Sequence, residues 1–421
     1  MRKKQDYLLK FASFTGKTIY EKLPSIEQAL IRRFAFNHRL TFQEFRQLVE
    51  ASRDLSMWDE GGLDKWWRSL PESASHNGKE QFLSRLKAYM TTLRVNPKRY
   101  HRNMDRNPLR RTRKEVLQQA TDNRIYGMCP VASEKTVCCN LRTIDVVENC
   151  VFGCSYCTIQ TFYTEHIHIQ QNIAEKLDQI VLDPNRFYHF GTGQASDSLA
   201  WGNRDGILDT LFQYARKHPN ILMEFKTKSK NIQHFLENQV PVNVVCSWSL
   251  NPEEVIEHEE HFTASLSERL SAARTMADRG IKLAFHFHPM VYYEGWENAY
   301  GEIAEQIIQG FHPDEVLFIS FGSVTLIKPV IQKIRNLGNP TKILQMELVP
   351  DPHGKLTYPD DIKIKLFRLM YEKFVPWHAL VFFYLCMEKA EIWQAALNYV
   401  YPSNEAFEQD FGRHTMCKIG H

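Results

Sequence analysis

The sequence predicts an α/β protein in which a helical N-terminal region precedes a parallel β-sheet with helical crossovers. Residues 1 to about 120 have the periodicity of amphipathic helices, whereas from about residue 143 short apolar runs alternate with helical patterns. Each parallel strand must return through a crossover, and this alternation provides one. The expected domains are a helical, partly basic region at 1–120 and an α/β core at 121–421.

The segment "LTFQEFRQLVEAS" has the signature of a helix N-terminus. Thr41 stands at the N-cap and Glu44 follows three residues later, which together make a capping box. Phe45 and Leu48 then follow at helical spacing. We therefore expect a helix that begins directly after Thr41.

A basic stretch ends the helical region. Nine Lys or Arg residues and a single acid lie between Arg94 and Lys114, although the net charge of the chain is only +3. Such a stretch suits a phosphate backbone, and it equally suits a solvated connector. Both interpretations stay open at this point.

Six apolar runs predict the strands of the sheet, and two later runs are candidates for more. Helical patterns such as "GILDTLFQYARKH" and "SERLSAARTMADRG" separate them, and the second ends at Gly280. A barrel or partial barrel fits this pattern better than an open sheet. The six runs are residues 143–147, 187–190, 221–225, 242–250, 281–288 and 316–320, and the two candidates are 343–349 and 379–386.

Polar and sulfur-bearing residues follow the predicted strands one after another. A cysteine array comes after the first strand, "GTGQASD" after the second, "KTKSK" after the third, "SWSLNPE" after the fourth and "HFHPM" after the fifth. The carboxyl ends of barrel strands meet at one face, where active sites lie. The pattern therefore indicates a single active site.

Composition favours a soluble, intracellular protein that uses cysteine for metal or redox chemistry. The chain has 43% hydrophobic residues and no apolar run of about 18 residues that would suit a membrane span. The segment "MRKKQDYLLKF" lacks the features of a signal peptide. An odd number of cysteines, nine in all, argues against a disulfide framework.

The array "VENCVFGCSYCTIQ" places Cys150, Cys154 and Cys157 in a C-x3-C-x2-C pattern. Structural zinc requires four ligands, so a fourth would have to come from Cys138 or Cys139. Three thiolates on a four-iron cluster instead leave one iron open for an exchangeable ligand. The spacing favours the cluster.

These residues resemble the radical S-adenosylmethionine enzymes, and among them the spore photoproduct lyase group. The likeness covers roughly residues 125–400, including "ENCVFGCSYCTIQT", "GTGQASDSL", "EFKTKS", "SWSLNPEEV" and "YLCMEKAEIW". It implies a partial (β/α)6 barrel with extra C-terminal strands and a helical N-terminal extension. It also implies a [4Fe-4S] cluster on the three array cysteines, with S-adenosyl-L-methionine on the fourth iron as the source of a 5'-deoxyadenosyl radical.

The same resemblance implies a lyase that repairs a nucleic-acid base, such as a pyrimidine photoproduct in DNA. The expected partners are DNA or another nucleic acid and an electron donor such as a flavodoxin or ferredoxin. The expected location is the cytoplasm, with no membrane partner. An extruded or single-stranded base is expected as the substrate.

The resemblance and the residue types together suggest the cofactor contacts. Ser196 and Asp197 suit the methionine moiety, although Ser-Asp also suits a helix N-cap. Lys228 suits the carboxylate. Ser249 and Asn251 suit the ribose hydroxyls, with a strand-end turn as the alternative. The full set of expected cofactor-binding residues is Tyr156, Ser196, Asp197, Lys228, Ser249, Asn251 and Pro289.

The sequence departs from the lyases at the hydrogen-atom donor. Those enzymes carry a cysteine after the second strand, where this chain has Gln194, and a carboxamide does not readily donate a hydrogen atom. Cys246 and Cys386 are candidate replacements, with burial as small hydrophobic side chains as the alternative. Gln194, Cys246 and Cys386 are therefore the candidate catalytic residues.

Two other functions stay open. One is a radical S-adenosylmethionine enzyme that modifies RNA, a peptide or a small molecule, which the presence of Gln194 permits. The other is a zinc-stabilised nucleic-acid-binding module without catalysis. That module predicts a colourless protein and does not require the cofactor residues to converge on the cysteines.

Overall fold

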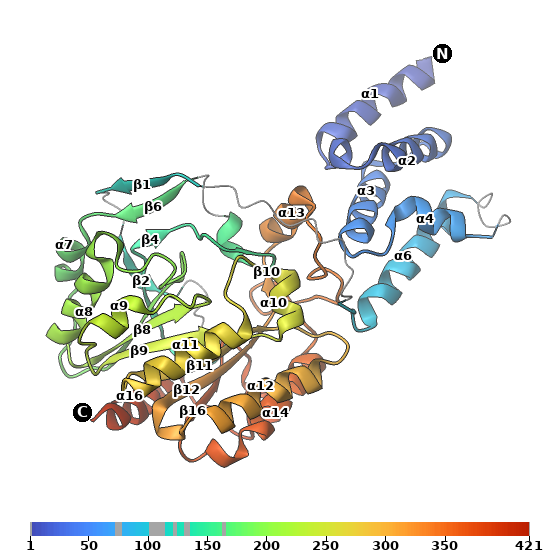
Figure 1. The fold of residues 1–421 in the computed structure, drawn as a ribbon. Coiled ribbons are helices and arrows are strands. Elements are labelled where there is room, and N and C mark those ends of the chain that lie inside the picture. The colour runs from blue at the N-terminus through green and yellow to red at the C-terminus, as the bar shows by residue number, and fades with distance from the viewer. Residues whose placement is uncertain are drawn as a thin grey trace. The chain divides into compact units, whose positions relative to one another are not determined.

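The computed structural model describes residues 2–71, 78–100, 114–120, 124–129, 135–161 and 166–420. The chain forms two compact units (Figure 1). Unit 1 comprises Met1–Arg110 and Leu326–Leu348, and unit 2 comprises Arg111–Thr325 and Val349–His421. The sequence-based boundaries instead place Leu326–Leu348 in the 121–421 core, because no local pattern distinguishes this segment from its neighbours.

Unit 1 is helical, as predicted, and its capping box is confirmed. The Thr41 amide donates to Glu44 Oε2 (2.7 Å) and the Glu44 amide donates to Thr41 Oγ1 (3.4 Å). The returning segment is held by an ion pair in which Arg335 Nε lies 2.8 Å from Asp54 Oδ1. The helices are α1 (Arg2–Gly16), α2 (Ser25–His38), α3 (Phe42–Met57), α4 (Gly62–Ser69), α6 (Lys79–Val95) and α13 (Lys328–Leu337), with the 3-10 turn η1 (Tyr20–Lys22).

The strand predicted at 343–349 is wrong. Only its last residue is in a strand, β14 (Val349–Pro350), and the rest forms turns inside unit 1. Ile343 and Leu344 are buried there, and Lys342 Nζ donates to the Trp58 carbonyl oxygen (2.5 Å). The apolar run is therefore buried against helices rather than in a sheet.

Unit 2 is built on a curled eight-stranded sheet, a half-barrel in the order β16-β12-β11-β9-β8-β7-β3-β2 (Figure 1). Neighbouring strands are parallel except β2 and β3. The predicted α/β class, all six strands and the later strand in 379–386 are confirmed. The strands are β2 (Tyr126–Met128), β3 (Arg142–Ile144), β7 (Tyr188–Thr192), β8 (Ile221–Thr227), β9 (Val244–Ser249), β11 (Lys282–Met290), β12 (Val316–Ser323) and β16 (Phe382–Leu385).

Short strands surround this sheet. Strand β5 pairs with β10, and β6 lies between β1 and β4. Their bounds are β1 (Val116–Gln119), β4 (Val147–Glu148), β5 (Gly153–Cys154), β6 (Ile167–Gln170), β10 (Glu260–His261), β13 (Thr325–Leu326) and β15 (Leu356–Thr357).

Helices cover the outer face of the sheet, and one helix covers part of its inner face. Phe212 and Phe235 pack on outward-facing Phe225, with ring centroids 5.7 and 5.4 Å away. On the inner face, Phe411 of α16 packs against His189 and Phe318 near the strands' N-terminal ends. The helices are α7 (Ile173–Asp178), α8 (Ile207–Lys217), α9 (Gln233–Glu237), α10 (Glu253–Glu259), α11 (Leu266–Asp278), α12 (Trp296–Gly310), α14 (Asp360–Lys373), α15 (Ala390–Leu397) and α16 (Asn404–Ile419), with 3-10 turns η2 (Thr158–Thr161), η3 (Arg204–Gly206), η4 (Pro313–Glu315) and η5 (Val375–Trp377).

Most of the predicted basic segment, residues 101–113, lies outside the described residues. Two of its described residues form contacts within unit 1. Arg94 forms an ion pair with Asp54 (3.2 Å), and buried Lys98 donates to the Lys342 carbonyl oxygen (3.2 Å). Lys98 is therefore buried away from solvent, whereas Arg94 keeps 36% of its side chain exposed.

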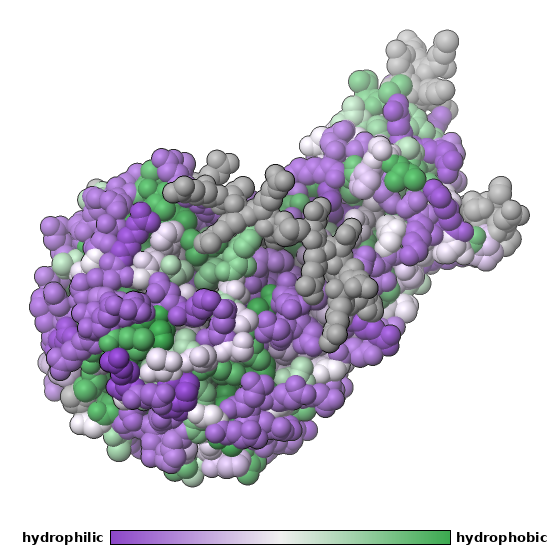
Figure 2. Space-filling model, in the orientation of Figure 1, coloured by the Kyte–Doolittle hydropathy of each residue, from purple (hydrophilic) through white to green (hydrophobic). Residues whose placement is uncertain are grey.

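The surface in view is mostly hydrophilic, with apolar residues in small areas (Figure 2). Within the described ranges, the helices are all too short or too polar to cross a bilayer.

Candidate active site

The three array cysteines lie on a loop that begins after β4 and is anchored to the segment following β9. Strand β5, which contains Cys154, pairs antiparallel with β10, and the Ser155 amide donates to the Glu259 carbonyl oxygen (2.8 Å). The Cys157 amide donates back to the Cys154 carbonyl oxygen (3.1 Å). Backbone hydrogen bonds therefore hold the loop at the end of the half-barrel where the carboxyl ends of the strands lie.

The donor set of this loop fits a multi-iron group. Burial, assisted by the nearby Asp197 and Cys157, raises the pKa of Cys150 to about 12, and burial with Glu260 raises the pKa of Cys154. Among the described residues, no three His, Cys, Asp or Glu side chains converge as the ligands of a single metal ion. Three thiols on one short loop are the ligand type that an iron–sulfur cluster takes.

A buried carboxylate, Glu260, lies beside the loop and connects it to the barrel. Glu260 accepts hydrogen bonds from Tyr156 Oη, Asn251 Nδ2 (2.8 Å) and Arg269 Nη2 (2.6 Å), and Lys228 Nζ is 3.9 Å away. Burial alone would raise its pKa, but the charges of Arg269 and Lys228 and these hydrogen bonds lower it to about 2. Glu260 is therefore ionised at neutral pH. No local sequence pattern marks Glu260 or Arg269.

Lys228 and Tyr156 lie together beside the cysteines. The Lys228 ammonium is 6.0 Å from the centroid of the Tyr156 ring, and its side chain is 15% exposed. A partly exposed cation beside an aromatic ring is suited to bind the carboxylate of a small ligand.

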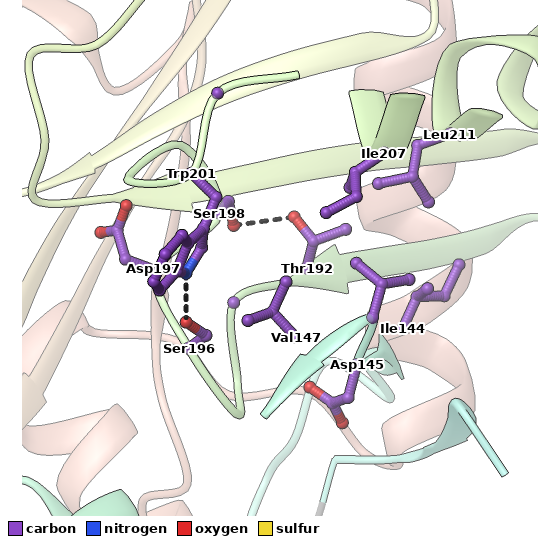
Figure 3. Close-up of a pocket in the computed structure, with 13 residues that line it drawn as sticks. Ile144, Asp145, Val147, Thr192, Ser196, Asp197, Ser198, Trp201, Ile207 and Leu211 are labelled. Atoms are coloured by element: carbon purple, nitrogen blue, oxygen red, sulfur yellow. Dashed lines mark hydrogen bonds between the residues drawn. The ribbon is translucent and has the colours of Figure 1, made fainter. Parts of the chain in front are cut away.

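A narrow pocket opens at the carboxyl ends of β3 and β7, beside α8 (Figure 3). Thr192 Oγ1 donates to Ser198 Oγ (2.7 Å), and Trp201 Nε1 donates to Ser196 Oγ (3.3 Å). The Asp145 carboxylate also lines the pocket and accepts the Ala195 amide (3.0 Å). The pocket therefore combines these polar groups with apolar side chains from β3 and β4, Ile144 and Val147, and from α8, Ile207 and Leu211.

Asp197 is occupied by the protein itself. Its carboxylate accepts the amides of Leu199 (3.1 Å), Ala200 (2.9 Å) and Lys228 (2.7 Å), and the Thr227 hydroxyl (2.8 Å). These contacts favour the capping role of Asp197 over a contact between its carboxylate and the ammonium group of a ligand. Asp197 joins the loop after β7 to the end of β8.

Gly193 allows this loop to pass close to β8. Its φ is +89°, and a Cβ atom there would lie 2.5 Å from Ser198 Oγ and 3.0 Å from the Lys226 carbonyl oxygen. Only glycine fits both the conformation and the space.

Asn251 also uses its amide inside the protein, because Oδ1 accepts the Tyr300 hydroxyl (2.6 Å) while Nδ2 binds Glu260. Ser249 is buried at the end of β9, and its carbonyl oxygen accepts Arg269 Nη1 (2.8 Å). Pro289 is half-buried within β11. The structure thus brings Asn251 to the site as a positioning residue.

The three candidate catalytic residues lie in different places. Gln194 is half-buried on the loop after β7, and no side-chain hydrogen bond is found for it in the described part of the chain. Cys246 pairs in register with Phe225 on the outer face, and its Sγ donates to the Phe225 carbonyl oxygen (3.7 Å). It therefore has no access to the barrel interior. Cys386 follows β16 on the inner side.

A chain of hydrogen bonds crosses the inner face. Lys226 Nζ bonds His288 Nδ1 (3.3 Å), His288 Nε2 bonds Ser320 Oγ (3.1 Å), Ser320 Oγ bonds His286 Nδ1 (2.5 Å), and His286 Nε2 bonds Glu224 Oε1 (2.5 Å). One set of neutral histidine tautomers, with both protons on Nε2, satisfies every member. His189 and Ser247 also form hydrogen bonds with the Glu224 carboxylate.

Lowering the pH should destabilise this chain of hydrogen-bonded side chains. Burial, with the charge of Lys226, lowers the pKa of His286 to about 4 despite Glu224. This pKa is below that of histidine in the unfolded chain, about 6.5. The contribution of neutral His286 to the free energy of unfolding is therefore full above pH 6.5, and on the order of 3 kcal/mol is lost as the pH falls from 6.5 to 4.

Urea unfolding at pH 7.5, 6 and 5 measures this loss. His286→Gln should flatten the profile relative to the exposed-site control His312→Gln. An equally steep profile in His286→Gln would contradict the assignment.

Comparison with known proteins agrees with the fold. A family model described as spore photoproduct lyase matches residues 137–346, about half the chain. The chain is 25% identical over 201 residues to spore photoproduct lyase of Clostridium acetobutylicum, covering 45% of this chain and 59% of that protein. It is 26% identical over 172 residues to that of a Geobacillus species, covering 39% and 50%. The chain thus spans between half and three-fifths of these relatives.

Solved structures share the fold. A spore photoproduct lyase variant with bound AdoMet and dinucleoside spore photoproduct matches with a TM-score of 0.55 at 21% identity, covering 64% of this chain and 81% of that one. The lyase complexed with dinucleoside spore photoproduct matches with a TM-score of 0.53 at 20% identity and the same coverage. Within the radical S-adenosylmethionine superfamily, the chain belongs with the spore photoproduct lyase-like proteins.

Proposed function

We propose that the protein is a radical S-adenosylmethionine enzyme that acts as a lyase on a damaged nucleic-acid base, with a pyrimidine photoproduct in DNA as the lesion. The observation that carries the proposal is the three-cysteine loop held by Glu260 at the carboxyl edge of the half-barrel. The fold shared with spore photoproduct lyases supports it.

In this proposal Cys150, Cys154 and Cys157 would hold a [4Fe-4S] cluster, and the same site would bind S-adenosylmethionine. When bound, these groups supply the one-electron chemistry that yields a 5'-deoxyadenosyl radical. Lys228 and Tyr156 orient the polar end of the cofactor, and the Ser196 pocket lies nearby. Ser249 and Pro289 line the ribose and adenine side. Asp197, Asn251 and Glu260 position these groups through the contacts given above.

The substrate class rests on the relatives. The two curated relatives are named spore photoproduct lyase, and a solved structure contains the dinucleoside photoproduct. A base in a duplex cannot reach an inner barrel face, so the lesion enters extruded or single-stranded. An external one-electron donor of the flavodoxin or ferredoxin type completes the system.

Anaerobic reconstitution with iron and sulfide, followed by dithionite and S-adenosylmethionine, tests the proposal. We expect a brown protein that releases 5'-deoxyadenosine and reverses the photoproduct in ultraviolet-irradiated oligonucleotides. A colourless, zinc-loaded protein would contradict the enzyme. Release of 5'-deoxyadenosine without lesion reversal would favour RNA, a peptide or a small molecule as the substrate, consistent with Gln194.

A further inference from the structure

Four cysteines from three segments gather near the carboxyl edge of the half-barrel, and we name them the thiol group. The backbone brings the segments together. The Cys129 amide donates to the Leu141 carbonyl oxygen (2.9 Å), and Val137 bridges antiparallel to Glu388. Cys139 and Cys386 each lie two residues along the chain from this isolated bridge. The members of the thiol group are Cys129, Cys138, Cys139 and Cys386.

Side-chain interactions agree with this placement. A hydrogen bond with Cys138 and burial raise the pKa of Cys139, and Cys386 and Cys129 raise it further. Burial raises the pKa of Cys386, and Cys129 and Cys138 contribute. Each of these two thiols therefore lies close to members from the other segments, and both keep their protons at neutral pH.

Cys386 is the member on the inner face of the sheet. Phe382 and Tyr384 face inwards, where they pack against Phe411 of α16. Side chains two residues apart along a strand point to the same face. The Cys386 amide donates to the Phe321 carbonyl oxygen (2.8 Å), which extends the ladder with β12 to this residue. The alternation therefore directs Cys386 inwards too.

Two lysines, Lys226 and Lys228, lie at the end of β8. Lys228 lies next to Tyr156 of the cysteine loop, with its ammonium 6.0 Å from the ring centroid. Lys226, two residues earlier, lies close enough to Cys386 for its charge to oppose the burial-driven rise in the pKa of that thiol. The thiol group and the cysteine loop therefore border the same edge of the half-barrel.

We propose that Cys386, supported by its neighbours in the thiol group, is the hydrogen-atom donor that quenches the product radical in this enzyme. The proposal rests on the proposed function. A carbon radical takes a hydrogen atom from a thiol because the S–H bond is weaker than the C–H bond formed. A protonated thiol is required, since a thiolate has no hydrogen atom to give.

The Cys386 S–H bond breaks homolytically, the new C–H bond forms on the product, and one unpaired electron remains on sulfur. One electron from the external donor and one proton then restore the thiol. Gln194, at the place of the lyases' cysteine, takes no part in this transfer.

Turnover in D2O buffer tests the proposal, because thiol protons exchange with solvent. The reconstituted enzyme is reduced with dithionite and given S-adenosylmethionine and the dinucleoside photoproduct, and mass spectrometry follows both products. The wild type should place one solvent deuterium in the repaired dinucleoside. In Cys386→Ser, 5'-deoxyadenosine release should continue while the deuterated product falls at least about tenfold.

Cys417→Ser is the matched control, because Cys417 is an exposed thiol on α16. It should behave as the wild type. Cys386→Ala provides a second variant. The visible absorbance of the cluster checks that both Cys386 variants bind a full cluster. Wild-type deuterium incorporation in either folded Cys386 variant would overturn the donor assignment. Absence of 5'-deoxyadenosine from the wild type would instead refute the proposed function.

Discussion

Cys154→Ser should abolish 5'-deoxyadenosine formation while leaving the protein folded. The serine hydroxyl is a poor iron ligand, and the β5–β10 pairing that holds position 154 uses only the backbone. Loss of a partner around a metal ligand costs 10- to 100-fold, so loss of a ligand should lower activity by at least about 100-fold. Iron and sulfide content, visible absorbance and 5'-deoxyadenosine yield measure the effect.

The control for this variant is again Cys417→Ser, which changes a thiol away from the site. Its cluster content and yield should match those of the wild type. A Cys154→Ser protein that keeps a full cluster and cleaves S-adenosylmethionine would show that Cys154 is not a ligand. Equal losses in Cys150→Ser and Cys157→Ser are expected.

Glu260→Gln should destabilise unit 2 more than any surface substitution. The change leaves Arg269, which is fully buried, without its 2.6 Å counter-charge. Breaking a buried pair by removing one partner costs about 3–5 kcal/mol. The pKa of Glu260, lowered to about 2, means that its contribution is present above pH 4.5 and is lost as the pH falls through 2.

Urea unfolding at pH 7 measures the loss of stability in Glu260→Gln. Asp178→Asn is the control, since its ion pair with Lys217 is 62% exposed on both sides and should contribute at most about 1 kcal/mol. Iron retention should also fall in Glu260→Gln, because Tyr156 in the cysteine loop loses its carboxylate partner. Unfolding free energies equal to those of the control would show that the carboxylate is not needed to hold Arg269.

Local patterns predicted most of the half-barrel. The strand β8 and its neighbours carry continuous apolar runs, and the helix at 266–278 ends just before its predicted glycine stop, Gly280. The run at 343–349 failed because apolar residues show that a segment is buried, not whether a sheet or a helix bundle buries it. The structure resolved that choice through contacts with Trp58 and its neighbours in unit 1.

The predicted cofactor residues also divide into those that a local pattern reveals and those whose role depends on distant partners. A cysteine triplet within eight residues is a local feature, and its spacing alone indicated a cluster. Asp197 and Asn251 have suitable chemistry for a ligand, yet their hydrogen-bonding groups are engaged by Thr227, Lys228 and Tyr300. Those partners lie on other strands and helices, so residue type could not reveal them.

The sequence by itself determined the fold class, the strand–helix alternation and the three-cysteine loop, because each depends on residues close together in the chain. Only the tertiary structure decided that Glu260 and Arg269 hold the loop, that Cys246 faces outwards and that Cys386 follows β16 on the inner face. Burial, sheet register and charge pairing join residues that are distant in sequence, and these exist only after the chain has folded.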